Sequence, residues 1–294
     1  MSAPDLTAPT ANGALAAPRR DRPAYRQFPT AVQFAIRDQA RNRLAGLLLI
    51  IFVPTWYLLL LAMAGHKPLQ FKLFSTGQVI LADGGHLTLI TAGLNALTII
   101  TGFVVFHSVH AALPFDRRLV FAGYRKTTLV ASKTLATAVV AVSVAVYTAL
   151  VLLAFWRPSL AGFRDITAAY MVIALTYGAF GLLLGVLVKG DLEGFFLIIM
   201  GALVDTFLQN PLGNPLANKP ILEWFPSFGP MQFAVGGSLG HAAPGGYLVL
   251  GLIWAAAFTG AGLVIFMIRA RVRTHAVSGR AGVPETRKAP PATP

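Results

Sequence analysis

The sequence predicts an all-α, polytopic membrane protein. Of its residues, 55% are hydrophobic and only 12% are charged, and the mean hydropathy of +0.66 is too high for a water-soluble domain. Uninterrupted apolar runs have the length needed to cross a bilayer, about 20 residues as a helix. Barrel strands would instead alternate apolar and polar residues. We therefore expect six transmembrane helices, at about 44–64, 85–106, 127–155, 166–188, 195–208 and 246–268.

The apolar runs define a transmembrane domain at residues 28–275, between disordered tails at 1–27 and 276–294. Of the 24 Lys and Arg, 19 fall before the first run, after the last run, in the connections after the second and fourth runs, or at the start of the third run. The positive-inside rule places such segments, and therefore both termini, in the cytoplasm. The net charge of +13 is thus explained by orientation and by contact with anionic lipid headgroups, not by nucleic-acid binding.

A basic amphipathic segment directly precedes the first span. Phe28, Val32 and Ile36 share one helical stripe, beside arginines at 37, 41 and 43. This pattern predicts an N-terminal helix, at about 30–43, lying on the membrane surface. The alternative is a basic flank that only fixes the orientation of the first span.

The second run carries polar side chains at helical spacing. Their offsets of three and four residues place them on one helix face: Thr88, Thr91, Asn95 and Thr98. Such groups commonly bond to neighbouring helices or to carbonyls of their own helix. The alternative is that they line a polar path through the membrane.

The fourth run carries a face of small residues, Gly178, Gly181 and Gly185. Glycines at this spacing allow two helices to approach closely.

A short basic hinge joins the second and third runs. Pro114 is suited to open a helix there and Gly123 to close it. One face of that helix is apolar, and the segment also carries four basic residues: Arg117, Arg118, Arg125 and Lys126. A basic, amphipathic turn at a membrane surface predicts docking to a partner on that side.

The segment at 210–246, before the last run, is rich in Pro and Gly but keeps an apolar middle around Trp224 and Phe225. It is too apolar for a simple loop and too interrupted to span the membrane. We expect short re-entrant helices that dip into the outer leaflet, where Trp and Phe are favoured.

Catalytic and energy-coupling signatures are missing from the sequence. In GYRKT (123–127), Arg125 stands where a P-loop needs glycine. Asp205 is the one ionisable residue well inside a run, and it has no evident basic partner. His107 and His110 lack a third ligand nearby. We therefore expect a conduit or scaffold with no catalytic, cofactor-binding or metal-binding residues.

With the surface helix, the basic hinge and the Pro-rich outer segment, the chain resembles the membrane (permease) subunits of type-2 ATP-binding-cassette exporters. The resemblance covers most of residues 28–273 and is carried by LPFDRRLVFAGYRKTTLVASK and EWFPSFGPMQFAVGGSL. Many members carry a Glu near the start of the hinge, where this chain has only Asp116.

The resemblance implies a six-span half-transporter in a bacterial plasma membrane, working as a homodimer or a paired half-transporter. ATP and Mg²⁺ would bind to a separate cytoplasmic ATPase, so the chain itself would not be an enzyme. Residues 114–126 would be the coupling helix, and the polar stripe of the second run would line the path. The implied coupling residues are Phe115, Asp116, Arg117, Arg118, Leu119, Tyr124 and Arg125.

Two other classes of protein stay open. An ion-gradient-driven secondary carrier would need no ATPase, but it usually keeps ionisable residues within its spans. A membrane enzyme acting on lipids would need a polar cluster at one interface, for which His107, His110 and Asp116 are the nearest approach. The residues do not indicate the substrate.

Overall fold

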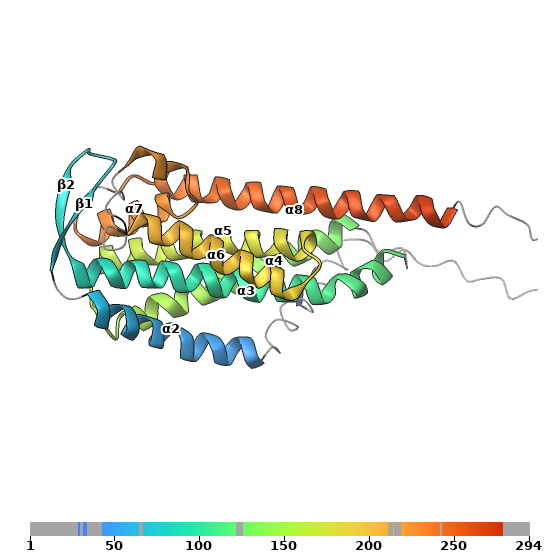
Figure 1. The fold of residues 1–294 in the computed structure, drawn as a ribbon, viewed down its shortest axis with the longest axis horizontal. Helices are drawn as coiled ribbons and strands as arrows, with labels where there is room; N and C mark the ends of the chain where they lie inside the picture. Colours follow the sequence, from blue (N-terminus) through green and yellow to red (C-terminus); the bar gives the residue numbers. More distant parts are fainter. Residues whose placement is uncertain are drawn as a thin grey trace, which may run out of the picture.

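The computed structural model describes residues 29, 32–33, 43–64, 67–121, 126–210, 214, 219–241 and 243–278. The predicted disordered tails and the predicted amphipathic helix at 30–43 therefore lie almost entirely outside the described residues. The described chain forms an elongated bundle of helices (Figure 1). We call its two ends the hairpin end, which carries the strands β1 and β2, and the hinge end, where α3 meets α4.

Helix α3 (Gly84–Phe121) is the central helix of the bundle. In its most apolar stretch, 89% of the residues are buried, against 11% for α8 (Gly246–Ser278). α3 packs against α2 (Arg43–Ala64), α4 (Lys126–Leu152), α5 (Leu160–Leu187) and α6 (Asp191–Gln209). Any displacement of α3 therefore reaches most of the fold.

Four helices are long and apolar enough to cross a membrane, namely α3, α4, α5 and α8. In α2 the apolar stretch is shorter, Leu49–Ala64. Large apolar side chains remain exposed on the outer helices, including Leu58, Met63, Phe196, Phe207 and Ile253. Water would make such contiguous surfaces an aggregation hazard, whereas lipid acyl chains solvate them. The helical, membrane-type character predicted from the sequence is thus confirmed.

The close contact between α3 and α5 depends on glycine, as the small-residue face of the fourth run predicted. A Cβ at Gly181 would meet the backbone of Gly102, and it would lie 3.1 Å from the backbone nitrogen of Phe106. A Cβ at Gly185 would lie 2.9 Å from the Cβ of Val109. Only glycine lets the two backbones approach this closely along α5.

A β-hairpin, which the sequence analysis did not predict, precedes α3. Strands β1 (Pro68–Lys72) and β2 (Val79–Asp83) pair antiparallel, with Pro68 opposite Asp83. Gly77 has φ +69° in the connecting turn, a conformation that favours glycine. The Gln232 amide fixes the hairpin to α7 (Phe228–Ser238), accepting from the Phe74 backbone nitrogen at 3.2 Å and donating to the Lys72 carbonyl at 3.0 Å.

The boundary of the hinge differs from the prediction. Pro114 does not open a separate short helix, because α3 runs through it without interruption to Phe121. Proline removes only one hydrogen bond from the helix ladder, and long apolar helices tolerate this loss. The predicted coupling helix at 114–126 is therefore, up to Phe121, the last two turns of α3. Residues 122–125 lie outside the described residues.

The segment before the last run contains two short helices, as its composition suggested. The 3₁₀-helix η1 (Pro220–Trp224) and α7 both lie at the hairpin end (Figure 1). Every residue from Phe228 to Gly237 of α7 is buried. The fifth and sixth predicted runs correspond to α6 and α8, and α8 continues to Ser278, beyond the predicted start of the second tail.

Candidate functional site

The hinge end brings four of the predicted coupling residues together on α3. Lys133 of α4 forms an ion pair with Asp116, whose side chain is only 5% exposed. On the adjoining surface the Phe115 ring is 62% exposed, and Arg118 in the last turn is exposed as well. Leu119 is half-buried. An apolar ring and a cation thus project from a helix end that a buried ion pair ties to α4.

The other predicted coupling residues are not placed by the structure. The backbone of Arg117 belongs to α3, but its side chain is outside the described part of the chain. Tyr124 and Arg125 lie in the connection at 122–125, which is also outside it. Their role in coupling therefore stays a prediction.

A second cluster at the hinge end closes the carboxyl terminus of α5, and the sequence analysis did not predict it. Arg269 of α8 donates hydrogen bonds to the carbonyl oxygens of Val186 and Leu187. The Nδ1 of His110 in α3 lies 3.3 Å from the carbonyl oxygen of Gly185. Arg269 is a cationic donor, which satisfies the free carbonyls of a helix end and complements its dipole.

The same histidine reaches α6. Its Nε2 lies 3.6 Å from a carboxylate oxygen of Asp191, in the first turn of that helix. We call Arg269, His110 and Asp191, with the α5 carbonyls, the α5-end cluster. It links α3, α5, α6 and α8 at the hinge end, and along α3 it lies roughly one to two helical turns before Phe115 and Arg118.

The polar stripe on α3 is buried within the bundle. Thr91 and Thr98 donate to carbonyls of their own helix, at 2.8 and 2.7 Å. The Asn95 amide nitrogen donates to the Thr206 hydroxyl of α6 at 2.6 Å. Two oxygens, Oγ1 of Thr88 and Oδ1 of Asn95, are buried without a hydrogen-bond partner in the described chain. Most of the stripe thus serves helix contacts, and two acceptors are left over.

Within the described part of the chain, the partners of Asp205 are hydroxyl and backbone amide groups rather than basic side chains. Its carboxylate accepts from the Tyr177 hydroxyl at 2.8 Å, and from the Ser227 hydroxyl at 2.7 Å and backbone nitrogen at 3.0 Å. Asp205 is 3% exposed. The network joins α5, α6 and the start of α7, and hydrogen bonds of this kind stabilise a buried carboxylate. Ser227 directly precedes α7, so a polar residue before a predicted helix was the signal available in the sequence.

The two histidines near the hinge stack on different phenylalanine rings. His107 stacks on Phe103 with ring centroids 6.4 Å apart, and His110 stacks on Phe106 at 5.4 Å. Within the described ranges, no three His, Asp or Glu side chains gather in a way that would hold a metal ion.

No protein-family model matches this sequence, and no curated protein matches it.

Proposed function

We propose that this chain is the membrane (permease) subunit of an ATP-binding-cassette exporter, working as a dimer with a separate cytoplasmic ATPase. In this proposal α2, α3, α4, α5, α6 and α8 are the six spans. The helices η1 and α7 dip into the outer leaflet, and both termini are cytoplasmic, in a bacterial plasma membrane.

The observation that carries the proposal is the exposed end of α3. At 38 residues, and roughly 1.5 Å per residue, α3 is about 57 Å long. The hydrocarbon core is only about 30 Å thick. If α3 enters the membrane near Gly84, its last turns extend past the bilayer. Phe115 and Arg118 are then offered to the aqueous side, where an apolar ring in water favours a protein contact.

In this proposal, the ion pair and the α5-end cluster transmit a movement of the exposed end of α3 to other helices. Lys133 attaches the exposed end of α3 to α4 through Asp116. His110 and Arg269 attach α3 and α8 to the end of α5. A partner that pushes on Phe115 would therefore move several helices together, as rigid-body switching requires.

The test compares exposed residues at the two ends of the bundle. The variant Phe115→Ala/Arg118→Glu changes the hinge end, and Leu160→Ala/Arg157→Glu is the matched control at the hairpin end, where Leu160 is 85% exposed. Each is co-expressed with a P-loop ATPase that co-purifies with the unaltered chain from its native membrane, and is purified in mild detergent. We expect the hinge variant alone to lose the ATPase while keeping its elution volume.

If both variants retain the ATPase equally, the surface that carries Phe115 and Arg118 does not bind it. If no ATPase co-purifies with the unaltered chain from its native membrane either, the exporter proposal itself is wrong.

A second candidate, an ion-gradient-driven carrier, is favoured by one observation, the buried carboxylate of Asp205. Buried ionisable groups in membrane helices often carry a coupling ion. Here the carboxylate is satisfied by three donors, which favours a structural role. The test uses proteoliposomes with a proton gradient and no ATPase. Substrate uptake that is lost in the Asp205→Asn variant would support the carrier.

A further inference from the structure

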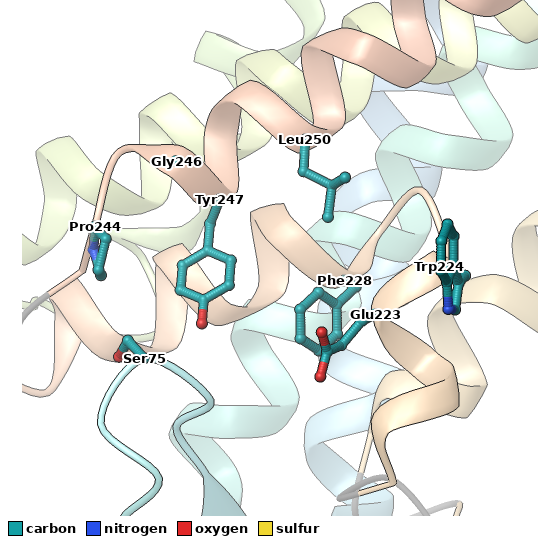
Figure 2. Close-up of a pocket in the computed structure, with 8 residues that line it drawn as sticks. All are labelled: Ser75, Glu223, Trp224, Phe228, Pro244, Gly246, Tyr247 and Leu250. Atoms are coloured by element: carbon teal, nitrogen blue, oxygen red, sulfur yellow. The ribbon is translucent and has the colours of Figure 1, made fainter.

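A pocket of about 500 Å³ lies at the hairpin end, remote from the hinge. Ser75 of the hairpin turn, Glu223 and Trp224 of η1, and Phe228 of α7 face Tyr247 and Leu250 of α8 across it (Figure 2). Its size falls within the range of small-molecule sites, about 300–1,000 Å³. Four different elements contribute walls, so the pocket depends on the fold of the whole hairpin end.

The aromatic floor of the pocket is built into the core. Phe228 is only 2% exposed and packs edge-on against Phe74, with centroids 5.1 Å apart, and against Tyr247 at 5.9 Å. A Cβ at Gly229 would meet the Tyr247 carbonyl, so α7 and α8 are in direct contact here. The floor is therefore rigid before any ligand arrives, which reduces the entropy lost on binding.

The rim of the pocket combines an aromatic ring with a negative charge. The Trp224 side chain is 79% exposed. Next to it stands Glu223, the one charged side chain that lines the pocket, and it has no ion pair or hydrogen bond within the part of the chain that the structure describes. A cation would gain both the carboxylate charge and the negative faces of the rings.

An ammonium already makes such a contact beside the pocket. The Nζ of Lys72 lies 4.8 Å from the centroid of the Phe74 ring, which also packs edge-on against Phe228. The hairpin end thus already holds one cation on its aromatic cluster.

We propose that this pocket binds a hydrophobic organic ammonium ion. An anion would be repelled by Glu223, and Ca²⁺ requires six to eight oxygen ligands, which a single carboxylate and the Ser75 hydroxyl do not provide. Glu223 is exposed, and a neutral apolar ligand would displace water from its carboxylate without replacing the lost hydrogen bonds. A quaternary or protonated amine with an apolar body satisfies the charge, the rings and the volume together.

The probe is benzyltrimethylammonium, titrated calorimetrically into the full chain in a neutral maltoside detergent, with benzenesulfonate as an anion of similar size. We expect saturable binding of the cation alone. Glu223→Gln should weaken it roughly tenfold, because charge and cation–π attraction act together on a partly desolvated ion. Trp224→Leu should weaken it roughly threefold by removing one ring face.

Glu193→Gln, at the exposed start of α6, is the matched control and should bind as the unaltered chain does. No saturable binding below about 10 mM, equal binding by Glu223→Gln, or equal binding of benzenesulfonate would each overturn the proposal. If Trp224→Leu fails to fold, the Glu223→Gln comparison decides alone. None of these titrations involves an ATPase, so they test ligand binding by the pocket independently of the exporter proposal.

Discussion

Lys133 of α4 forms an ion pair with the buried carboxylate of Asp116 on α3. The two partners differ in exposure, since the lysine side chain is 22% exposed and the aspartate side chain 5%. A cation on a long stem reaches water more readily than a short buried carboxylate does. The pair is therefore asymmetric, and the cost of breaking it depends on which partner is removed.

We predict that Lys133→Met destabilises the fold by about 3 kcal/mol or more, because it leaves a buried carboxylate without a cation. Asp116→Asn should cost only about 1 kcal/mol, since the released ammonium can reach water. The double variant should recover to within about 1 kcal/mol of the unaltered chain. Thermal unfolding in one detergent compares all three, and equal losses for the two single variants would contradict the asymmetry.

The contact between α3 and α5 gives a second prediction. Gly181→Ala should destabilise the fold by about 1–3 kcal/mol, the usual cost of overpacking, because its Cβ would meet backbone atoms of Gly102 and Phe106 that cannot move aside. Gly260→Ala is the control, as nothing lies within 4 Å of its Cβ in α8. Equal melting temperatures for the two variants would show that α3 and α5 are not closely packed.

The parts of this fold that could be predicted from the sequence are mostly those whose signal lies within a run of neighbouring residues. The apolar runs are local, and all six correspond to helices. Pro114 was a misleading local signal, because packing along α3 outweighs the loss of one hydrogen bond. The hairpin had a weak signal, with short alternating strands around Gly77. This signal is hard to separate from an ordinary outer loop.

In the candidate sites too, features that depend on contacts between distant residues could not be predicted from the sequence. An exposed hinge could be predicted from its charges. The partners of Asp116, Asp205 and Arg269 could not, because Lys133, Ser227 and Val186 stand 17, 22 and 83 residues away in the chain. Such pairs form only when the topology brings distant helices together, and a single sequence without its fold does not contain that information.

The Asp205 network gives a third prediction. Asp205→Ala leaves the Tyr177 hydroxyl and both Ser227 donors without this acceptor, so we expect a loss of about 3 kcal/mol or more, at roughly 1–3 kcal/mol per buried group. Tyr177→Phe removes one donor and should cost about 1 kcal/mol. Glu193→Ala, at the exposed start of the same helix α6, is the control.

A double-mutant cycle between Asp205→Ala and Ser227→Ala shows whether the network acts as a unit. We expect a coupling energy of at least about 1 kcal/mol between the two changes. Additive losses would mean that α6 and the start of α7 are held by packing alone.

The fourth prediction concerns the stripe on α3 and makes use of the absence of cysteine from this chain. Buried polar oxygens without partners are uncommon in folded proteins and call for an explanation. Oγ1 of Thr88 and Oδ1 of Asn95 are two such oxygens in the described chain. If these oxygens meet water or substrate when the path opens, Thr88→Cys and Asn95→Cys should react with a water-soluble thiol reagent during ATP turnover with the partner ATPase, and only slowly at rest.

Leu97→Cys is the matched control for this experiment. Leu97 is on the same helix and is 0% exposed, but at about 100° per residue it lies on the face opposite the stripe. We expect it to stay unreactive in both states. Labelling of all three positions during turnover would indicate general loosening of the bundle. If Thr88→Cys and Asn95→Cys stay as protected as Leu97→Cys, the stripe serves helix packing alone, and a path through the dimer would have to run along another helix.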